Sequence, residues 1–186
     1  MRAVGRDQIV DYATYEDGRE ALRREVLAAK EVRRVHLGEH FTLLFENRLT
    51  VRYQIQEMMR VERIVREADV QHEIDTYNEL LGGPGELGCT LLIEIDDADE
   101  RAAKLAKWHG LPARFYLALP DGRRVYGRMD ARQEDERRIS SVHYLKFDTG
   151  GATPVGAGID FPGLETFVDL DARQRAALHD DLRDDT

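Results

Sequence analysis

Cysteine is almost absent from this 186-residue chain, and its single member, Cys89, lies in the apolar run Cys-Thr-Leu-Leu-Ile. One cysteine has no partner within the chain, so the sequence excludes a secreted scaffold held by disulfides. The chain also lacks a run of about eighteen apolar residues, and its first residues carry no apolar core of signal-peptide length. We therefore expect a cytoplasmic protein without a membrane span.

Positive charge is also scarce, because 36 acidic residues face 27 basic ones and the formal net charge is −9. A chain with this balance is not attracted as a whole to nucleic acid or to anionic lipid, so we expect neither as a partner. Most of the basic residues are arginines, whose planar guanidinium suits carboxylate pairing. The few lysines are Lys30, Lys104, Lys107 and Lys146.

The length and the absence of any shift in composition predict a single α+β domain spanning residues 1–186. Apolar periodicity predicts an N-terminal helix over 14–36, a helical hairpin over 50–81, a helix over 96–109 and a C-terminal helix over 171–182. Apolar, β-prone runs predict a mostly antiparallel sheet from segments 40–47, 88–95, 114–119, 124–129 and 139–147. The loop over 149–162 has room for one more short strand, and the pattern leaves open one sheet or two.

The hairpin is predicted from two apolar stripes that cannot share one straight helix. At about 100° per residue the second stripe would point roughly 160° away from the first. A break near residues 68–70, with Asp69 as the N-cap of the second helix, removes the conflict. The first stripe is Val51, Ile55, Met58, Val61, Val65 and Ala68, and the second is Val70, Ile74, Tyr77 and Leu81.

Polar residues interrupt these stripes, and Glu62 is the most conspicuous because it lies about 40° from Met58 on the first one. A buried carboxylate or amide needs a partner, so we expect a polar network at the helical corner. The candidate binding residues are Glu46, Gln54, Glu57, Glu62, His72, Glu73 and Asn78.

Two interpretations of this corner stay open. In one, Glu62 and His72 bind a divalent metal or serve as an acid/base pair, since carboxylate and imidazole ligands suit such ions. In the other, Glu62 makes a structural ion pair with an arginine and His72 lies in a solvated helical turn. The paired Glu-x-x-His motifs of di-iron bundles are absent.

Two further patterns have weaker chemical meaning. The segment His36-Leu37-Gly38-Glu39-His40 matches H-x-x-E-H, but Gly38 and the β-prone residues after it argue against the helix that a zinc peptidase needs. His36 instead fits the C-terminus of the first helix. Arg33 or Arg34 would be the anion site if the chain were a small-ligand sensor.

Several longer motifs carry a resemblance. They are Phe45-Glu46-Asn47, Gln54-Ile55-Gln56-Glu57-Met58, Glu62-Arg63, the run from Gln71 to Leu80, Gly83-Pro84-Gly85-Glu86-Leu87 and Leu92-Ile93-Glu94-Ile95. Together they resemble the bacterial domain of unknown function family 3501, over roughly residues 5–147 with a weaker echo at 158–162. The resemblance implies a genomic context and no activity: such proteins are often encoded beside rubrerythrin-like di-iron proteins and iron–sulfur oxidoreductases.

The sequence therefore favours a non-catalytic accessory or regulatory partner of such a redox system, and it leaves open whether the chain is an enzyme. The alternative is a metal-dependent or acid/base enzyme that uses the polar corner around Glu62 and His72.

Overall fold

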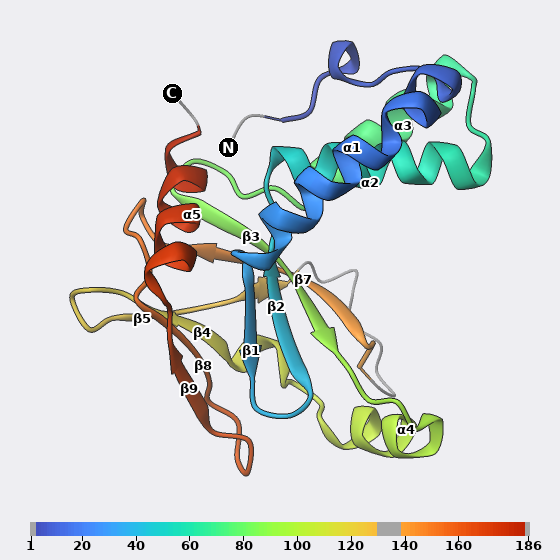
Figure 1. Cartoon of the computed structure of the whole chain (residues 1–186). Helices are drawn as coiled ribbons and strands as arrows, with labels where there is room; N and C mark the ends of the chain where they lie inside the picture. The colour runs from blue at the N-terminus through green and yellow to red at the C-terminus, as the bar shows by residue number, and fades with distance from the viewer. Residues whose placement is uncertain (1–2, 130–138, 185–186) are drawn as a thin grey trace.

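The computed structural model describes residues 3–129 and 139–184 (Figure 1). The helices are η1 (Arg6–Gln8), α1 (Tyr12–Glu31), α2 (Arg48–Glu62), α3 (Glu67–Asn78), α4 (Ala98–Lys107), η2 (Pro112–Arg114) and α5 (Ala172–Arg183). The strands are β1 (Arg34–Leu37), β2 (Phe41–Phe45), β3 (Glu86–Ile93), β4 (Phe115–Ala118), β5 (Arg124–Tyr126), β6 (Arg128–Met129), β7 (Val142–Asp148), β8 (Gly156–Ile159) and β9 (Thr166–Asp169). None of the described helices is long and apolar enough to span a membrane.

The described strands form two antiparallel sheets. The larger has the order β1-β2-β3-β7-β6 and the smaller the order β5-β4-β8-β9. The hairpin β4–β5 is the one that the turn Pro120-Asp121-Gly122 predicts, with Gly122 at φ 84°. Immediately after β5 the chain leaves the smaller sheet, because β6 pairs with β7 of the larger one.

The main core lies where the two sheets meet. Side chains from both sheets share one buried apolar cluster, in which Phe45 and Phe147 come from the larger sheet and Phe115 from the smaller one. Helix α4 adds Leu105, and α5 adds Leu178. At about 25 cal/mol per Å² of buried apolar surface, this cluster supplies most of the hydrophobic stabilisation of the fold. It therefore holds the sheets rigidly beneath the helices described next.

Helices α2 and α3 project from one end of the sheets and run beside α1, away from α5 (Figure 1). They form a helical hairpin with an apolar cluster of its own. Its buried members are Val4, Ile9, Val51, Ile55, Met59, Val70, Ile74 and Leu81. The far end of this hairpin thus depends on its own core rather than on the sheets.

Two side-chain amides fix the N-terminal segment against the hairpin. Asn78 accepts from the Val4 N–H at 2.8 Å and donates to the Val4 carbonyl at 3.0 Å. Gln56 does the same for Val10, at 2.8 and 3.2 Å. Each amide replaces the backbone partner that a non-helical, partly buried segment lacks.

The α+β class, the mostly antiparallel strands, the helical hairpin and the helices at both ends of the chain are confirmed. The first helix is shorter than predicted, since it begins after Asp11, whose carboxylate accepts from the Ala13 and Thr14 amides, and ends at Glu31. Its expected last turn is instead β1, where the β-branched Val35 faces the core. Strand β9 also escaped prediction, because its burial alternates over only four residues.

His36 is consequently on a strand and not at a helix C-terminus. Its Nδ1 lies 2.9 Å from the hydroxyl of Thr42, which donates to Glu94 at 2.6 Å. Gly38 turns the chain with φ 63°, and His40 follows the turn, beside Lys104. The H-x-x-E-H segment is therefore a β-hairpin, in agreement with the argument against a peptidase.

Candidate functional site

The break between the two hairpin helices is confirmed, but it lies at residues 63–66 rather than at 68–70. Helix α2 ends at Glu62, and the N-cap of α3 is Arg66 instead of Asp69. Because α2 ends at the far end of the hairpin, the helix does not continue past Glu62 along the predicted apolar stripe. Glu62 is exposed, so the prediction that this carboxylate points inward is wrong.

The histidine predicted to accompany Glu62 is also exposed. His72 lies on the outer side of α3, whereas Glu73 is half-buried. Among the described residues, no group of three or more histidine, cysteine, aspartate or glutamate side chains is arranged to hold a metal ion. The geometry therefore does not assemble the metal site that the sequence offered as one interpretation.

One of the predicted residues contacts a tyrosine that was not among the candidates. Gln54 hydrogen-bonds the hydroxyl of Tyr77, and the negative charges of Glu73 and Glu62 act on the same phenol electrostatically. Burial raises the pKa of Tyr77, and the nearby acidic groups raise it further. Tyr77 lies on the second apolar stripe, so the pattern marked it only as a core residue; its hydroxyl needs a partner, and that need was the signal to follow.

Glu57 faces α1 instead of the corner. It accepts from the Tyr15 hydroxyl at 2.6 Å and from two Arg19 nitrogens at 2.7 and 2.9 Å. The Arg60 Nε lies 3.4 Å away. These bonds, above all those from Arg19, lower the pKa of Glu57 to about 2. Glu57 therefore joins α1 to α2 as a permanently ionised group.

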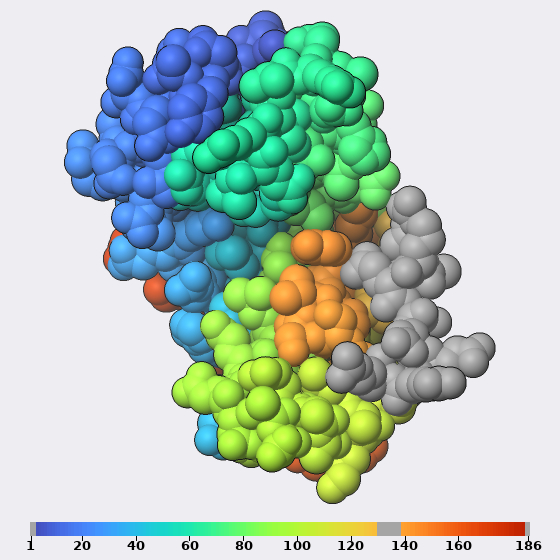
Figure 2. Space-filling view, turned by 90° about the vertical axis from the view of Figure 1, so that its right-hand side faces the viewer, coloured from blue at the N-terminus to red at the C-terminus, as the bar shows by residue number. Residues whose placement is uncertain are grey.

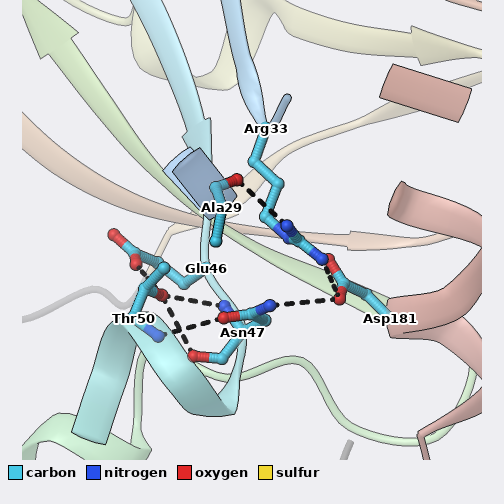
Figure 3. Close-up of polar contacts among 6 residues, drawn as sticks. All are labelled: Ala29, Arg33, Glu46, Asn47, Thr50 and Asp181. Carbon is cyan, nitrogen blue, oxygen red and sulfur yellow. Dashed lines mark hydrogen bonds and ion pairs between the residues drawn. The ribbon is translucent and has the colours of Figure 1, made fainter. Parts of the chain in front are cut away.

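Glu46 lies at the base of the hairpin, where β2 passes into α2 (Figure 3). Its buried carboxylate accepts from the hydroxyls of Thr50 and Thr90, at 2.6 and 2.7 Å. The next residue, Asn47, is the N-cap of α2 and accepts from the Thr50 amide. Burial raises the pKa of the neighbouring Cys89 thiol well above its usual value, and Glu46 adds to the effect. The thiol is therefore held in its unreactive form.

An ion pair that was not predicted also lies at the base of the hairpin. Arg33 donates to both carboxylate oxygens of Asp181, at 2.7 and 2.9 Å, and Asn47 also reaches Asp181 (Figure 3). Arg33 is therefore already neutralised, which rules it out as the anion site of the sensor hypothesis, whereas the alternative, Arg34, is exposed and stays a prediction. Residues so far apart in sequence reveal no pairing pattern.

The far end of the hairpin, which we call the hairpin tip, comprises residues 60–66. Its apolar side chains are turned outward: Val61 is 67% exposed and Val65 is 80% exposed. Beside it, a small pocket between α1 and α2 is lined by Tyr12, Tyr15, Gln56, Met59, Arg60 and Ile64. Tyr12, which is 50% exposed, brings an aromatic ring to the same place.

The backbone of the tip closes α2 with a Schellman-type turn. Arg63 is in the left-handed conformation, with φ 54°, and the Ile64 amide donates to the Met59 carbonyl at 3.0 Å. Ile64 and Met59 also line the same pocket, as the apolar contact of this motif requires. Glycine is the usual residue at such a position, and a residue with a side chain costs roughly 1–2 kcal/mol there.

Comparison with known proteins places the fold in context. The family model described as "Protein of unknown function (DUF3501)" matches residues 3–182. A crystal structure of a novel protein of unknown function from Burkholderia pseudomallei is similar, with 32% sequence identity and a TM-score of 0.89. The alignment covers 97% of this chain and 100% of that one. No curated protein matches the chain. The chain belongs to the DUF3501 family of proteins of unknown function.

Proposed function

We propose that this protein is a non-catalytic accessory or regulatory protein of a cytoplasmic redox system, and that it binds a di-iron or iron–sulfur protein through the hairpin tip. The observation that carries the proposal is the outward position of Val61 and Val65, 67% and 80% exposed, at the end of a projecting hairpin. The resemblance to proteins encoded beside rubrerythrin-like and iron–sulfur proteins supports the choice of partner.

Exposed valines cost free energy only when they lie together without cover, since single apolar residues are common on protein surfaces. Here Val61 and Val65 flank the same short turn, and Tyr12 lines the pocket beside it together with Ile64. Aromatic and aliphatic groups at the centre and arginines around them are the composition of protein–protein interfaces. A partner that covers this surface recovers the cost.

The hairpin is also suited to present such a surface. Glu57, with Tyr15 and Arg19, holds α1 against α2, while Asn78 and Gln56 fasten the N-terminal segment. These contacts fix the tip before a partner arrives, so binding does not have to order it. Rigid presentation of a small apolar surface is what docking without catalysis requires.

The experiment uses a rubrerythrin-like di-iron protein and an iron–sulfur oxidoreductase purified from the same source. Their affinity for the intact chain is measured by titration calorimetry, and then for Val61→Ser/Val65→Ser. We expect at least one protein to bind and the double variant to bind at least tenfold more weakly. The matched control is Val142→Ser, because Val142 is an exposed valine on β7, outside the tip. If neither redox protein binds the unaltered chain, the proposed partner is wrong.

One observation favours the second candidate, an acid/base or metal-dependent site at the helical corner. Gln54 hydrogen-bonds Tyr77, and the charges of Glu73, Glu62 and the Tyr144 phenol raise the pKa of Tyr77. Figure 2 shows the side of the molecule where the hairpin lies above β7 (orange), the strand that carries Tyr144. Elemental analysis of the purified protein tests it. Stoichiometric metal that is lost on Glu62→Ala or His72→Ala supports this candidate, whereas metal content below one tenth of an equivalent under all loading conditions opposes it.

A further inference from the structure

We propose that Arg63 and Arg66 at the hairpin tip recognise an acidic segment of the partner, and that an apolar side chain of that segment packs against the exposed Val61 and Val65. The inference rests on the proposed function and adds the chemistry of the partner. It is drawn from two arginines, each at a position where another residue type would make the folded protein more stable.

Arg63 is the first of these residues. It is the only non-glycine residue with positive φ in the described part of the chain. Its left-handed conformation terminates α2, and glycine adopts that conformation without the steric penalty of a Cβ. The side chain is exposed, and in the described part of the chain it forms no hydrogen bond or ion pair that would offset the strain. Backbone strain of this kind clusters at functional sites.

Arg66 is the second. It is the N-cap of α3, where serine, threonine, aspartate or asparagine would accept from the free amides of the first turn. Arginine has no acceptor, and Arg66 makes no side-chain cap bond. Its positive charge also lies at the positive end of the helix dipole, which is the unfavourable end for a cation. The preference for glycine at positive φ and the preference for an acceptor side chain at an N-cap are therefore both broken, at residues three positions apart on the same exposed turn.

The charge of the tip differs from that of the whole chain. Residues 60–66 contain three arginines and one glutamate, in a protein of net charge −9. The nearest acidic residue after the turn, Glu67, is already bound by Arg6 at 2.6 and 3.0 Å. The carboxylate of Glu57 forms ion pairs with both Arg60 and Arg19. Among the described residues, Arg63 and Arg66 form no ion pair, so an acidic partner meets two exposed guanidinium groups that are free to bind its carboxylates.

The exposed apolar side chains of the tip supply the apolar half of the interaction. Val61 is 67% exposed and Val65 is 80% exposed. Tyr12, which is 50% exposed, lines the small pocket beside them together with Ile64. A partner residue pair of one carboxylate and one aliphatic side chain would contact an arginine and a valine of the tip at the same time. Acidic and apolar residues side by side are thus the expected motif.

The test uses the full chain, with Arg63→Gly/Arg66→Asp as the variant and Arg175→Gln as the control. Arg175 is an exposed arginine on α5, a helix that lies away from the hairpin (Figure 1). Because both substitutions install the preferred residue, we expect the melting temperature of the double variant to rise. Its affinity for the redox protein that binds the unaltered chain falls at least tenfold, and Arg175→Gln changes neither quantity. A stable variant with unchanged affinity overturns the inference while leaving the proposed function intact.

A second measurement applies when neither redox protein binds. Fluorescence anisotropy then follows a labelled acidic peptide that alternates glutamate with leucine, beside a matched peptide with glutamine in place of glutamate. Binding of the acidic peptide alone, weakened by salt and by Arg63→Gly/Arg66→Asp, supports the chemistry assigned to the tip. Equal binding of both peptides, or binding only to phosphatidylglycerol vesicles, overturns it.

Discussion

Arg33 and Asp181 form a two-pronged ion pair, with N–O distances of 2.7 and 2.9 Å, that joins the end of α1 to α5 across 148 positions of sequence. Their side chains are only 11% and 6% exposed. Burial raises the pKa of Asp181, and Arg33 opposes that rise. The pair thus joins α5 to the segment that follows α1, and Asn47 connects Asp181 to the base of the hairpin.

Removing one member of this pair should cost more than removing both. Arg33→Met leaves the Asp181 carboxylate buried without its cation, and we expect the free energy of unfolding to fall by about 3–5 kcal/mol. Arg33→Met/Asp181→Leu should recover most of that loss, since no charge remains buried. Urea unfolding at neutral pH measures both. A double variant as unstable as the single one would show that the pair contributes net attraction.

Glu57 should make stability depend on acid. Its pKa is lowered from 4.5 to about 2, so the folded state releases the proton more readily than the unfolded chain does. The stabilisation is present above pH 4.5 and is lost as pH falls towards 2, by about 2 kcal/mol after allowance for partial exposure. Glu57→Gln should flatten this part of the stability curve in urea titrations at successive pH values. Glu16→Gln, an exposed change on α1, is the control and should leave the curve unaltered.

His143 should make the stability of the protein depend on pH in a higher range than Glu57 does. Burial lowers its pKa below 6.5, and its Nδ1 is buried without a hydrogen-bond partner, while Nε2 is 2.8 Å from the Ser140 carbonyl. Below pH 6.5 the unfolded chain binds a proton that the folded state resists. Stability therefore falls as pH drops, by at most about 1.4 kcal/mol per pH unit from this group. His143→Phe should remove that slope between pH 6.5 and 5, and a slope that persists unchanged would assign it to another residue.

Two glycines should respond oppositely to the same substitution. A Cβ on Gly88 would lie 1.9 Å from the Leu80 carbonyl oxygen, which belongs to rigid backbone. Gly88→Ala should therefore destabilise the protein by more than about 3 kcal/mol. Gly18 lies within α1 with nothing within 4 Å of its added Cβ, so Gly18→Ala should stabilise by about 0.5–1 kcal/mol. Thermal unfolding of both variants gives the comparison.

The sequence predicted those parts of the fold that local periodicity encodes. Stripe phase located a corner in the hairpin, and the turn Pro120-Asp121-Gly122 located the β4–β5 hairpin. The sequence did not predict the short strands β1 and β9, because four residues give too brief an alternation to distinguish a strand from the end of a helix or from a loop.

The candidate site was harder to predict, for a related reason. The inward direction of Glu62 followed from extending an ideal helix, but α2 ends at that residue and its side chain is exposed. Glu46 and Asn47 were visible as motif residues, yet their partners Thr90 and Asp181 come from distant elements. The strain at Arg63 depends on a backbone dihedral that no sequence pattern reports.

The claim that the hairpin tip is the partner-binding surface can be tested by hydrogen–deuterium exchange. The intact chain is mixed with the purified rubrerythrin-like protein or iron–sulfur oxidoreductase, and amide exchange is followed along the sequence. We predict slower exchange in residues 60–66 and at the start of α1, with α5 unchanged. Protection confined to α5 or to the smaller sheet, with the tip exchanging as fast as in the free protein, would contradict it.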